Sequence, residues 1–139
     1  MKYLLDTCVI SELVTKQPSE RVINWIDNIE QESIYLSVIT IGEISKGIEK
    51  LPDSKRKENL QQWLNDELQI RFRGKILGID TEVMLLWGKL TGKLESVGKE
   101  MPGMDSLIAA ITIHNSCSLV TRNTDDFECT GLNIINPWQ

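Results

Sequence analysis

Short apolar runs alternate with helical patterns along almost the whole chain of 139 residues. The runs lack the in-and-out alternation of a strand with one wet face, which indicates strands buried on both faces of a parallel sheet. Strands separated by helices are joined by right-handed crossovers, so we expect an α/β fold with three layers, α/β/α, and a central parallel sheet of four to five strands. The expected strands are Lys2–Leu5, Ile34–Ser37, Lys75–Ile79, Ser118–Thr121 and Asn133–Ile135.

The intervening segments carry apolar residues three or four positions apart, together with residues that start or stop helices. We expect a helical turn over Ser11–Thr15, a helix capped by Ser19, one opened by Thr40 and stopped by Pro52, and further helices over Ser54–Leu68, Thr81–Leu94 and Ser106–Asn115. Asp80 is placed to cap the fifth of these segments.

Length and composition predict one globular domain over residues 1–139, because the chain has no room for a second core. No apolar run approaches the roughly 20 residues of a membrane span, and the N-terminus does not resemble a secretory signal. The three cysteines, Cys8, Cys117 and Cys129, form no CxxC pair. We therefore expect a cytoplasmic protein with no disulfide framework, no zinc site and no membrane partner.

The charge balance excludes neither a nucleic-acid partner nor a protein partner. A net charge of −5 and a pI of about 4.9 would ordinarily count against nucleic acid. Net charge does not describe the local field, however, and clustered carboxylates that bind a cation would inflate the acidic count. Basic residues gather at 55–57 and 71–75, and for the first group a solvated helix face is the better interpretation.

Four polar residues fall where an expected strand hands over to a helix, or near such a point. Asp6 ends the first strand, Glu43 lies in the first turn of the helix after the second, Asp105 opens a helix, and Asn123 follows the fourth strand. In an α/β fold the carboxyl ends of the strands line one edge, where ligands bind. We therefore expect these side chains to converge.

Each of these residues also has a purely structural interpretation. Asp6 could cap the following helix, Glu43 could close a capping box with Thr40, and Asp105 could be a helix N-terminal charge. Asp126 is an ordinary turn residue. Such interpretations are adequate one by one, but they do not explain why several acids fall at the same edge.

Three carboxylates that face one another repel unless protons or a cation intervene. Oxygen ligands on a rigid frame suit Mg²⁺ or Mn²⁺, and a metal-activated water is then the natural nucleophile for a phosphodiester. The one histidine, His114, is expected to be structural. A histidine-paired ribonuclease mechanism and a histidine-based zinc site are therefore excluded.

Four motifs resemble those of the PIN-domain ribonucleases, specifically the VapC and FitB toxins of type II toxin–antitoxin systems. They occur in order across the chain: 4–12 (LLDTCVISE), 40–47 (TIGEISKG), 105–110 (DSLIAA), and 121–127 (TRNTDDF) with 136–138 (NPW). The resemblance implies a PIN fold and a metal-dependent endoribonuclease that uses Mg²⁺ or Mn²⁺.

The resemblance also assigns site residues. Asp6, Glu43 and Asp105 correspond to the catalytic acids that bind the metal, and Thr7 and Thr121 to hydroxyls beside them.

Two positions depart from the family pattern. The fourth acidic position falls on Asn123, an amide that brings no charge, and Asp126 is close enough in sequence to compensate. Cys8 stands where the family usually has asparagine. We interpret Cys8 as a small apolar filler and not as a nucleophile, because no neighbour in sequence would lower its pKa.

The resemblance further implies a homodimer, a cognate antitoxin that blocks the active groove, and a structured RNA substrate such as tRNA or rRNA. Two alternatives remain open at this point. One is a non-catalytic PIN-like module that binds nucleic acid or protein. The other is a magnesium-dependent phosphatase with an aspartyl nucleophile, although such enzymes need a second aspartate at the position of Cys8.

Overall fold

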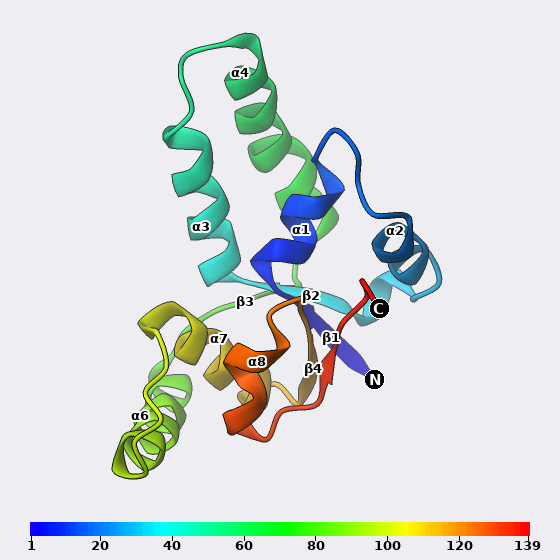
Figure 1. The fold of residues 1–139 in the computed structure, drawn as a ribbon. Coiled ribbons are helices and arrows are strands. Elements are labelled where there is room, and N and C mark those ends of the chain that lie inside the picture. Colours follow the sequence, from blue (N-terminus) through cyan, green and yellow to red (C-terminus); the bar gives the residue numbers. More distant parts are fainter.

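The computed structural model describes residues 1–139, and it contains one five-stranded parallel sheet (Figure 1). The strands are β1 (Lys2–Leu5), β2 (Ile34–Ser37), β3 (Ile76–Leu77), β4 (Cys117–Val120) and β5 (Ile134–Ile135), in the order β3-β2-β1-β4-β5. All four pairings are parallel, with Leu4 opposite both Tyr35 and Leu119 in the centre. The predicted α/β class and parallel sheet are confirmed.

Helices cover both faces of this sheet (Figure 1). Their bounds are α1 (Thr7–Leu13), α2 (Glu20–Asp27), α3 (Val38–Glu49), α4 (Lys55–Gln62), α5 (Gln69–Arg71), α6 (Thr81–Ser96), α7 (Gly103–His114) and α8 (Thr124–Phe127). Three short segments complete the list: η1 (Gln31–Ser33), the π-helical η2 (Trp63–Leu68) and η3 (Glu128–Thr130). None of the helices combines the length and the apolarity needed to cross a membrane.

The core has two parts, one on each face of the sheet. Leu5 packs with Val9 and Ile10 of α1 on the face that α1 to α4 cover, whereas Leu4 packs with Ile108 and Ile111 of α7 on the opposite face. Neighbouring strand residues point to opposite faces, so a strand that is apolar at every position can only be buried on both. This packing explains the continuous apolar runs.

Two helices begin earlier than the sequence pattern indicates. Helix α1 starts at Thr7 and not at Ser11, because the Asp6 carboxylate accepts a hydrogen bond from the Thr7 N–H (2.8 Å). Helix α3 starts at Val38 and not at Thr40, because Ser37 Oγ accepts from the Thr40 N–H (3.2 Å). The capping-box interpretation of Glu43 is therefore wrong: Ser37 is the cap, and Glu43 lies in the second turn.

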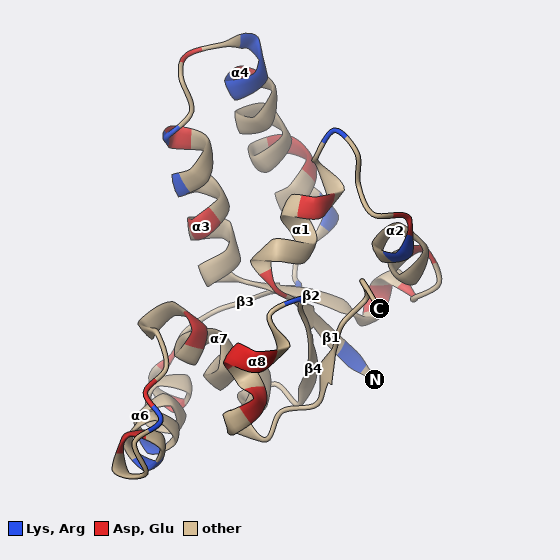
Figure 2. Ribbon diagram, viewed as in Figure 1, with Lys and Arg blue, Asp and Glu red and all other residues tan.

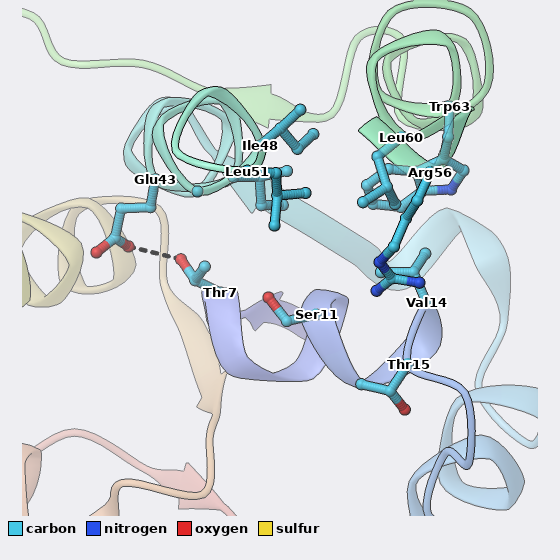
Figure 3. A pocket seen from close by; sticks show the side chains of 12 residues that line it. Thr7, Ser11, Val14, Thr15, Glu43, Ile48, Leu51, Arg56, Leu60 and Trp63 are labelled. Atoms are coloured by element: carbon cyan, nitrogen blue, oxygen red, sulfur yellow. Dashed lines mark hydrogen bonds between the residues drawn. The ribbon is translucent and has the colours of Figure 1, made fainter. Parts of the chain in front are cut away.

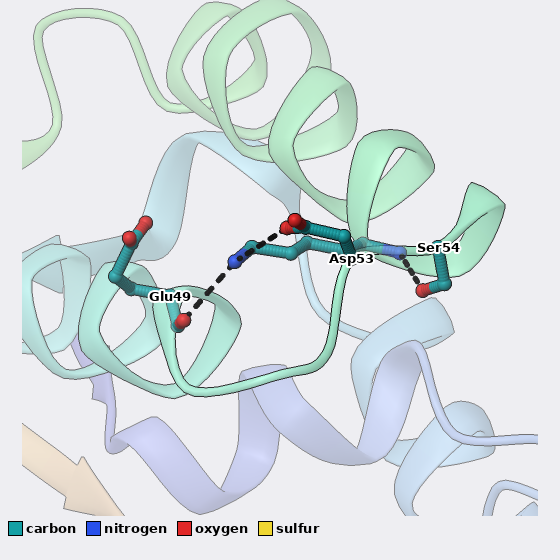
Figure 4. A network of polar contacts seen from close by, with 4 residues as sticks. Glu49, Asp53 and Ser54 are labelled. Atoms are coloured by element: carbon teal, nitrogen blue, oxygen red, sulfur yellow. Dashed lines mark hydrogen bonds and ion pairs between the residues drawn. The ribbon is translucent and has the colours of Figure 1, made fainter.

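Polar contacts join the end of α3 to the start of α4, and Figure 4 shows Glu49, Asp53 and Ser54, all of which contact Lys57. Lys57 Nζ donates to the Glu49 carbonyl (3.1 Å) at the end of α3 and lies 3.6 Å from Asp53 Oδ1. Only 13% of the Lys57 side chain is exposed, so its methylene stem is buried while its charge meets the carbonyl end of a helix. Lys57 thus adds a charged contact between the end of α3 and the start of α4.

We predict that Lys57→Ala lowers the free energy of unfolding by roughly 1 kcal/mol, because α3 loses a charged donor and the stem loses its packing. Lys55→Ala is the matched control: Lys55 pairs with Glu58 at 3.9 Å, and both side chains are largely exposed. An exposed pair of this kind is worth at most about 0.5 kcal/mol. Urea unfolding of both variants measures the difference, and equal losses would contradict the assigned role of Lys57.

Candidate active site

The carboxyl ends of the central strands bring the predicted site residues to one edge of the sheet. Asp6 directly follows β1, and Thr121 directly follows the neighbouring β4. Glu43 lies on α3, which leaves β2, and Asp105 lies in the first turn of α7. This edge is where ligands bind in parallel α/β folds.

Asp6 is the most constrained of these residues. Its residue surface is 5% exposed, and hydrogen bonds hold both of its carboxylate oxygens. Oδ1 accepts from the Thr7 N–H (2.8 Å), and Oδ2 accepts from Thr121 Oγ1 (2.8 Å). Thr121 Oγ1 in turn accepts from the Asn123 N–H (3.0 Å). The carboxylate is thus fixed by α1, by the end of β4 and by the loop after it.

Glu43 is held by hydroxyl groups. Thr7 Oγ1 donates to Glu43 Oε1 at 2.6 Å, as Figure 3 shows. Thr40 Oγ1 lies 2.9 Å from Thr7 Oγ1. Because the single Thr7 proton goes to Glu43, Thr40 must be the donor in this second bond. Thr40 is therefore part of the site, which sequence analysis missed because its position suggested a helix cap.

Burial and mutual repulsion both act on these acids. Burial raises the pKa of Asp6 above its usual range; hydrogen bonds from Thr121 and Thr7 oppose the shift, and the charges of Glu43 and Asp126 add to it. Burial also raises the pKa of Asp105, and the charges of Asp6, Asp126 and Glu43 reinforce the rise. Four carboxylates therefore lie close enough to act on one another.

The segment after β4 contains both candidates for the fourth acidic residue, and their contacts differ. Asn123 contributes its backbone N–H to Thr121, and its side chain makes no hydrogen bond, not even as a cap of α8. Asp126, one helical turn further on, raises the pKa of both Asp6 and Asp105. Of the two residues, Asp126 supplies charge to the site.

The donor set fits a divalent cation that retains water. All four acidic side chains offer oxygen ligands, which Mg²⁺ and Mn²⁺ prefer. With the side chains as they lie, no three acidic, histidine or cysteine residues converge closely enough to hold one ion. An ion bound through one or two carboxylates that keeps several waters, as Mg²⁺ does, needs no closed cage of protein ligands.

Cys8 contacts Asp6 and Thr121, whereas His114 contacts Glu82. Cys8 Sγ lies 3.9 Å from Asp6 Oδ2 and 3.5 Å from Thr121 Oγ1. Burial raises the pKa of the Cys8 thiol, so the group stays neutral, which agrees with its interpretation as a filler. His114 Nε2 lies 3.8 Å from Glu82 Oε2 of α6.

Two open hollows meet at Glu43. One, of about 290 Å³, runs from Thr7 and Glu43 between α1 and the α3–α4 hairpin to Arg56 and Trp63 (Figure 3). The other, of about 490 Å³, is lined by Glu43, Lys46, Lys50 and Met104 among others. Acidic and basic segments alternate along α3 in Figure 2. An extended ligand therefore has access to Glu43 from two directions.

Comparison with known proteins supplies the family. The PIN domain family matches residues 3–131. The chain is 38% identical to the plasmid stability protein StbB of Pseudomonas syringae over 98% of both chains. It is 36% identical to the toxin FitB of Neisseria gonorrhoeae over 97% of both. It is also 36% identical to the VapC ribonuclease Y4jK of Sinorhizobium fredii, over 98% of this chain and 97% of the relative.

A solved structure has the same fold over almost the same length. The structure of FitAB bound to the IR36 DNA fragment contains a chain that is 35% identical and superposes with a TM-score of 0.93. The match covers 99% of this chain and 96% of that one.

We predict that the metal-free protein gains stability on mild acidification. The folded pKa values of Asp6 and Asp105 are raised, so the folded state binds these protons more tightly than the unfolded state, whose aspartates titrate near 3.8. Stability is therefore lost as the pH rises through the raised pKa and recovered as it falls. Melting in EDTA from about pH 7 to about pH 5 measures this.

Asp6→Asn removes the buried charge while it keeps the shape and the capping oxygen. We expect it to raise the melting temperature in EDTA at neutral pH by a few degrees and to flatten the pH dependence. Added Mg²⁺ should stabilise the wild type more than the variant. A variant that melts below the wild type in EDTA would count against a strained carboxylate cluster.

Proposed function

Since the chain belongs to the PIN-domain family, among its VapC-type ribonuclease toxins, we propose that Asp6, Glu43 and Asp105 form its catalytic site and hold Mg²⁺ or Mn²⁺, either directly or through water molecules that the ion retains. The observation that carries this proposal is the buried Asp6 carboxylate, held by Thr7 and Thr121 against the charges of neighbouring acids. Such an arrangement costs stability, and a structural role does not require it.

The proposed reaction is hydrolysis of an RNA phosphodiester. A bound divalent cation supplies an activated water and neutralises charge on the phosphate. The hydroxyl groups of Thr121 and Thr7 orient Asp6 and Glu43, so that these carboxylates need no rearrangement when RNA arrives. Water attacks phosphorus and the bond to O3′ breaks, which leaves a 5′-phosphate and a 3′-hydroxyl.

We further propose that Asp126 takes the fourth acidic position, in place of Asn123. Its effect on the pKa of Asp6 and of Asp105 supports this assignment. Asn123 instead orients Thr121 through its backbone, a role that does not depend on its side chain.

The partners proposed for this chain follow its relatives. FitAB has been solved on a DNA fragment, and so has VapBC2 of Rickettsia felis, on a fragment from its promoter. We propose that this chain, a single PIN domain over residues 1–139, acts in the cytoplasm as a homodimer with a cognate antitoxin. Its substrate would be a structured RNA such as tRNA or rRNA. Exposed apolar side chains support a further interface: Val38, Met84, Leu85 and Met104.

Of the two alternatives, the phosphatase loses its basis. The residue two positions after Asp6 is Cys8, whose thiol is kept neutral by burial. A non-catalytic module would leave the repulsion among the four acids without a purpose.

We predict that the purified protein cleaves RNA only with Mg²⁺ or Mn²⁺, and that products carry 5′-phosphate and 3′-hydroxyl ends. Asp6→Asn, Glu43→Gln and Asp105→Asn should each lower cleavage at least about a hundredfold, because each removes a ligand charge. Glu20→Gln, an exposed acid in the first turn of α2, is the matched control. Activity that survives EDTA, or products ending in 2′,3′-cyclic phosphate, would refute the mechanism.

The fourth position can be tested by metal titration. We expect Asp126→Asn to weaken divalent binding about tenfold, whereas Asn123→Ala leaves it nearly unchanged. Calorimetric titration with Mn²⁺ compares the two variants with the wild type. The opposite order of effects would return the fourth position to Asn123.

A further inference from the structure

Three residues of the sequence motifs form a second constellation that contains none of the acids. Glu12 ends the first motif, Arg122 lies within the last, and Trp138 follows β5. The Arg122 guanidinium carbon lies 4.8 Å from the centroid of the Trp138 ring. Trp138 Nε1 donates to Glu12 Oε1 (3.3 Å). The C-terminal segment thus returns to α1 and provides a flat platform for Arg122.

The Trp138 platform is itself fixed. Its backbone N–H donates to Asn136 Oδ1 (3.0 Å), and Pro137 between them is buried. Glu12 lies on α1, the helix that Asp6 caps. The indole is therefore attached to the same helix as the catalytic aspartate.

Apart from its contact with Trp138, the Arg122 guanidinium has neither an ion-pair partner nor a hydrogen-bond partner. Arg122 is exposed, no carboxylate lies within 4.0 Å of it, and its side chain donates no hydrogen bond. Stacking holds the plane of a guanidinium but leaves all five N–H donors free at its rim. Arg122 is thus an oriented cation with no partner in the protein.

Arg122 also lies at the acidic edge. It directly follows Thr121, which donates to Asp6 Oδ2. Its backbone N–H and its charge both act on Cys8, whose Sγ is 3.9 Å from Asp6 Oδ2. An ionised carboxylate would ordinarily attract a neighbouring guanidinium, whereas the indole holds this one in a stack.

We propose that Arg122 binds a phosphate of the RNA next to the scissile bond, and that Trp138 and Glu12 position it for this contact. This inference rests on the ribonuclease function proposed above. A guanidinium fork matches two phosphate oxygens, and prior orientation reduces the entropy lost on binding.

A free cation beside the acids favours an anionic ligand, RNA, as the occupant of this edge. Four carboxylates gather at this edge in a chain with net charge −5, so a polyanion approaches against a repulsive field. A free, oriented cation beside the acids offsets that repulsion at the place where the backbone must lie. The acids attract cationic groups without help from Arg122.

Binding is measured in full-length protein that carries Asp6→Asn, so that the RNA stays intact. The probe is a fluorescein-labelled single-stranded RNA of mixed sequence, about 20 nucleotides long, titrated at several salt concentrations in Mg²⁺. Arg122→Gln should weaken binding about tenfold and lower the slope of log K against log salt by about 0.7. Arg73→Gln is the matched control. Arg73 is exposed and lies just before β3, which is the outermost strand on the side of the sheet away from β4 and β5.

The positioning role has its own readout. Trp138→Leu should weaken RNA binding nearly as much as Arg122→Gln, Trp138→Phe should retain most of the affinity, and adding Trp138→Leu to Arg122→Gln should cost little more. Arg122→Lys, which keeps the charge but not the fork, should fall between wild type and Arg122→Gln. If Trp138→Leu does not fold, Glu12→Gln tests the platform instead. It should weaken RNA binding less than Arg122→Gln does.

Equal affinities and equal salt slopes for Arg122→Gln and Arg73→Gln would overturn the inference. Full additivity of the Arg122 and Trp138 substitutions would overturn the positioning role. If the protein with Asp6 intact cleaves RNA, but Arg122→Gln in the Asp6→Asn protein leaves RNA affinity unchanged, only this inference fails. If that protein cleaves no RNA with Mg²⁺ or Mn²⁺, the proposed ribonuclease site fails instead.

Discussion

The hydrogen bonds to the Asp6 carboxylate are the contacts on which the rest of the site depends. They join α1 to the end of β4, two segments that are 115 residues apart in sequence. Because each oxygen has a donor, the carboxylate cannot turn away from its neighbours when burial makes its charge costly. A flexible acid would escape the repulsion by rotating into water. Asp6 is held in place, so the repulsion stays in the proposed active site, where a charged carboxylate would bind a cation.

Hydrogen bonds also orient the residues around Asp6. Thr40 and Thr7 orient Glu43 in series, and Asn123 orients Thr121 through a backbone N–H. Asp6 and Glu43, two of the proposed catalytic acids, are therefore supported by neutral donors, which restrict their geometry without cancelling their charge. Paired lysines or arginines would hold them equally well but would compete with a metal. The one arginine at this edge, Arg122, stacks on Trp138 and forms no ion pair.

Charge is distributed unevenly around this edge, with the acids grouped together and basic residues outside the group. Asp6, Glu43, Asp105 and Asp126 concentrate negative charge where a cation would bind. Arg122, Lys46 and Lys50 lie outside that group, with Lys46 and Lys50 along the hollow next to Glu43. The net charge of the chain says nothing about this local order.

The sequence by itself determined the α/β class, the five strands and the acids at their carboxyl ends. Short apolar runs without alternation, separated by helices, indicate strands buried on both faces of a parallel sheet. Asp6 ends the first run, Glu43 lies on the helix that leaves the second strand, and Asp105 opens a helix. The tertiary structure alone decided that Ser37 caps α3, that the charge of Asp126 reaches Asp6, and that Arg122 lies over Trp138. Trp138 and its partner Glu12 are 126 residues apart. Such contacts depend on how separate elements pack, and local periodicity carries no information about distances between distant segments.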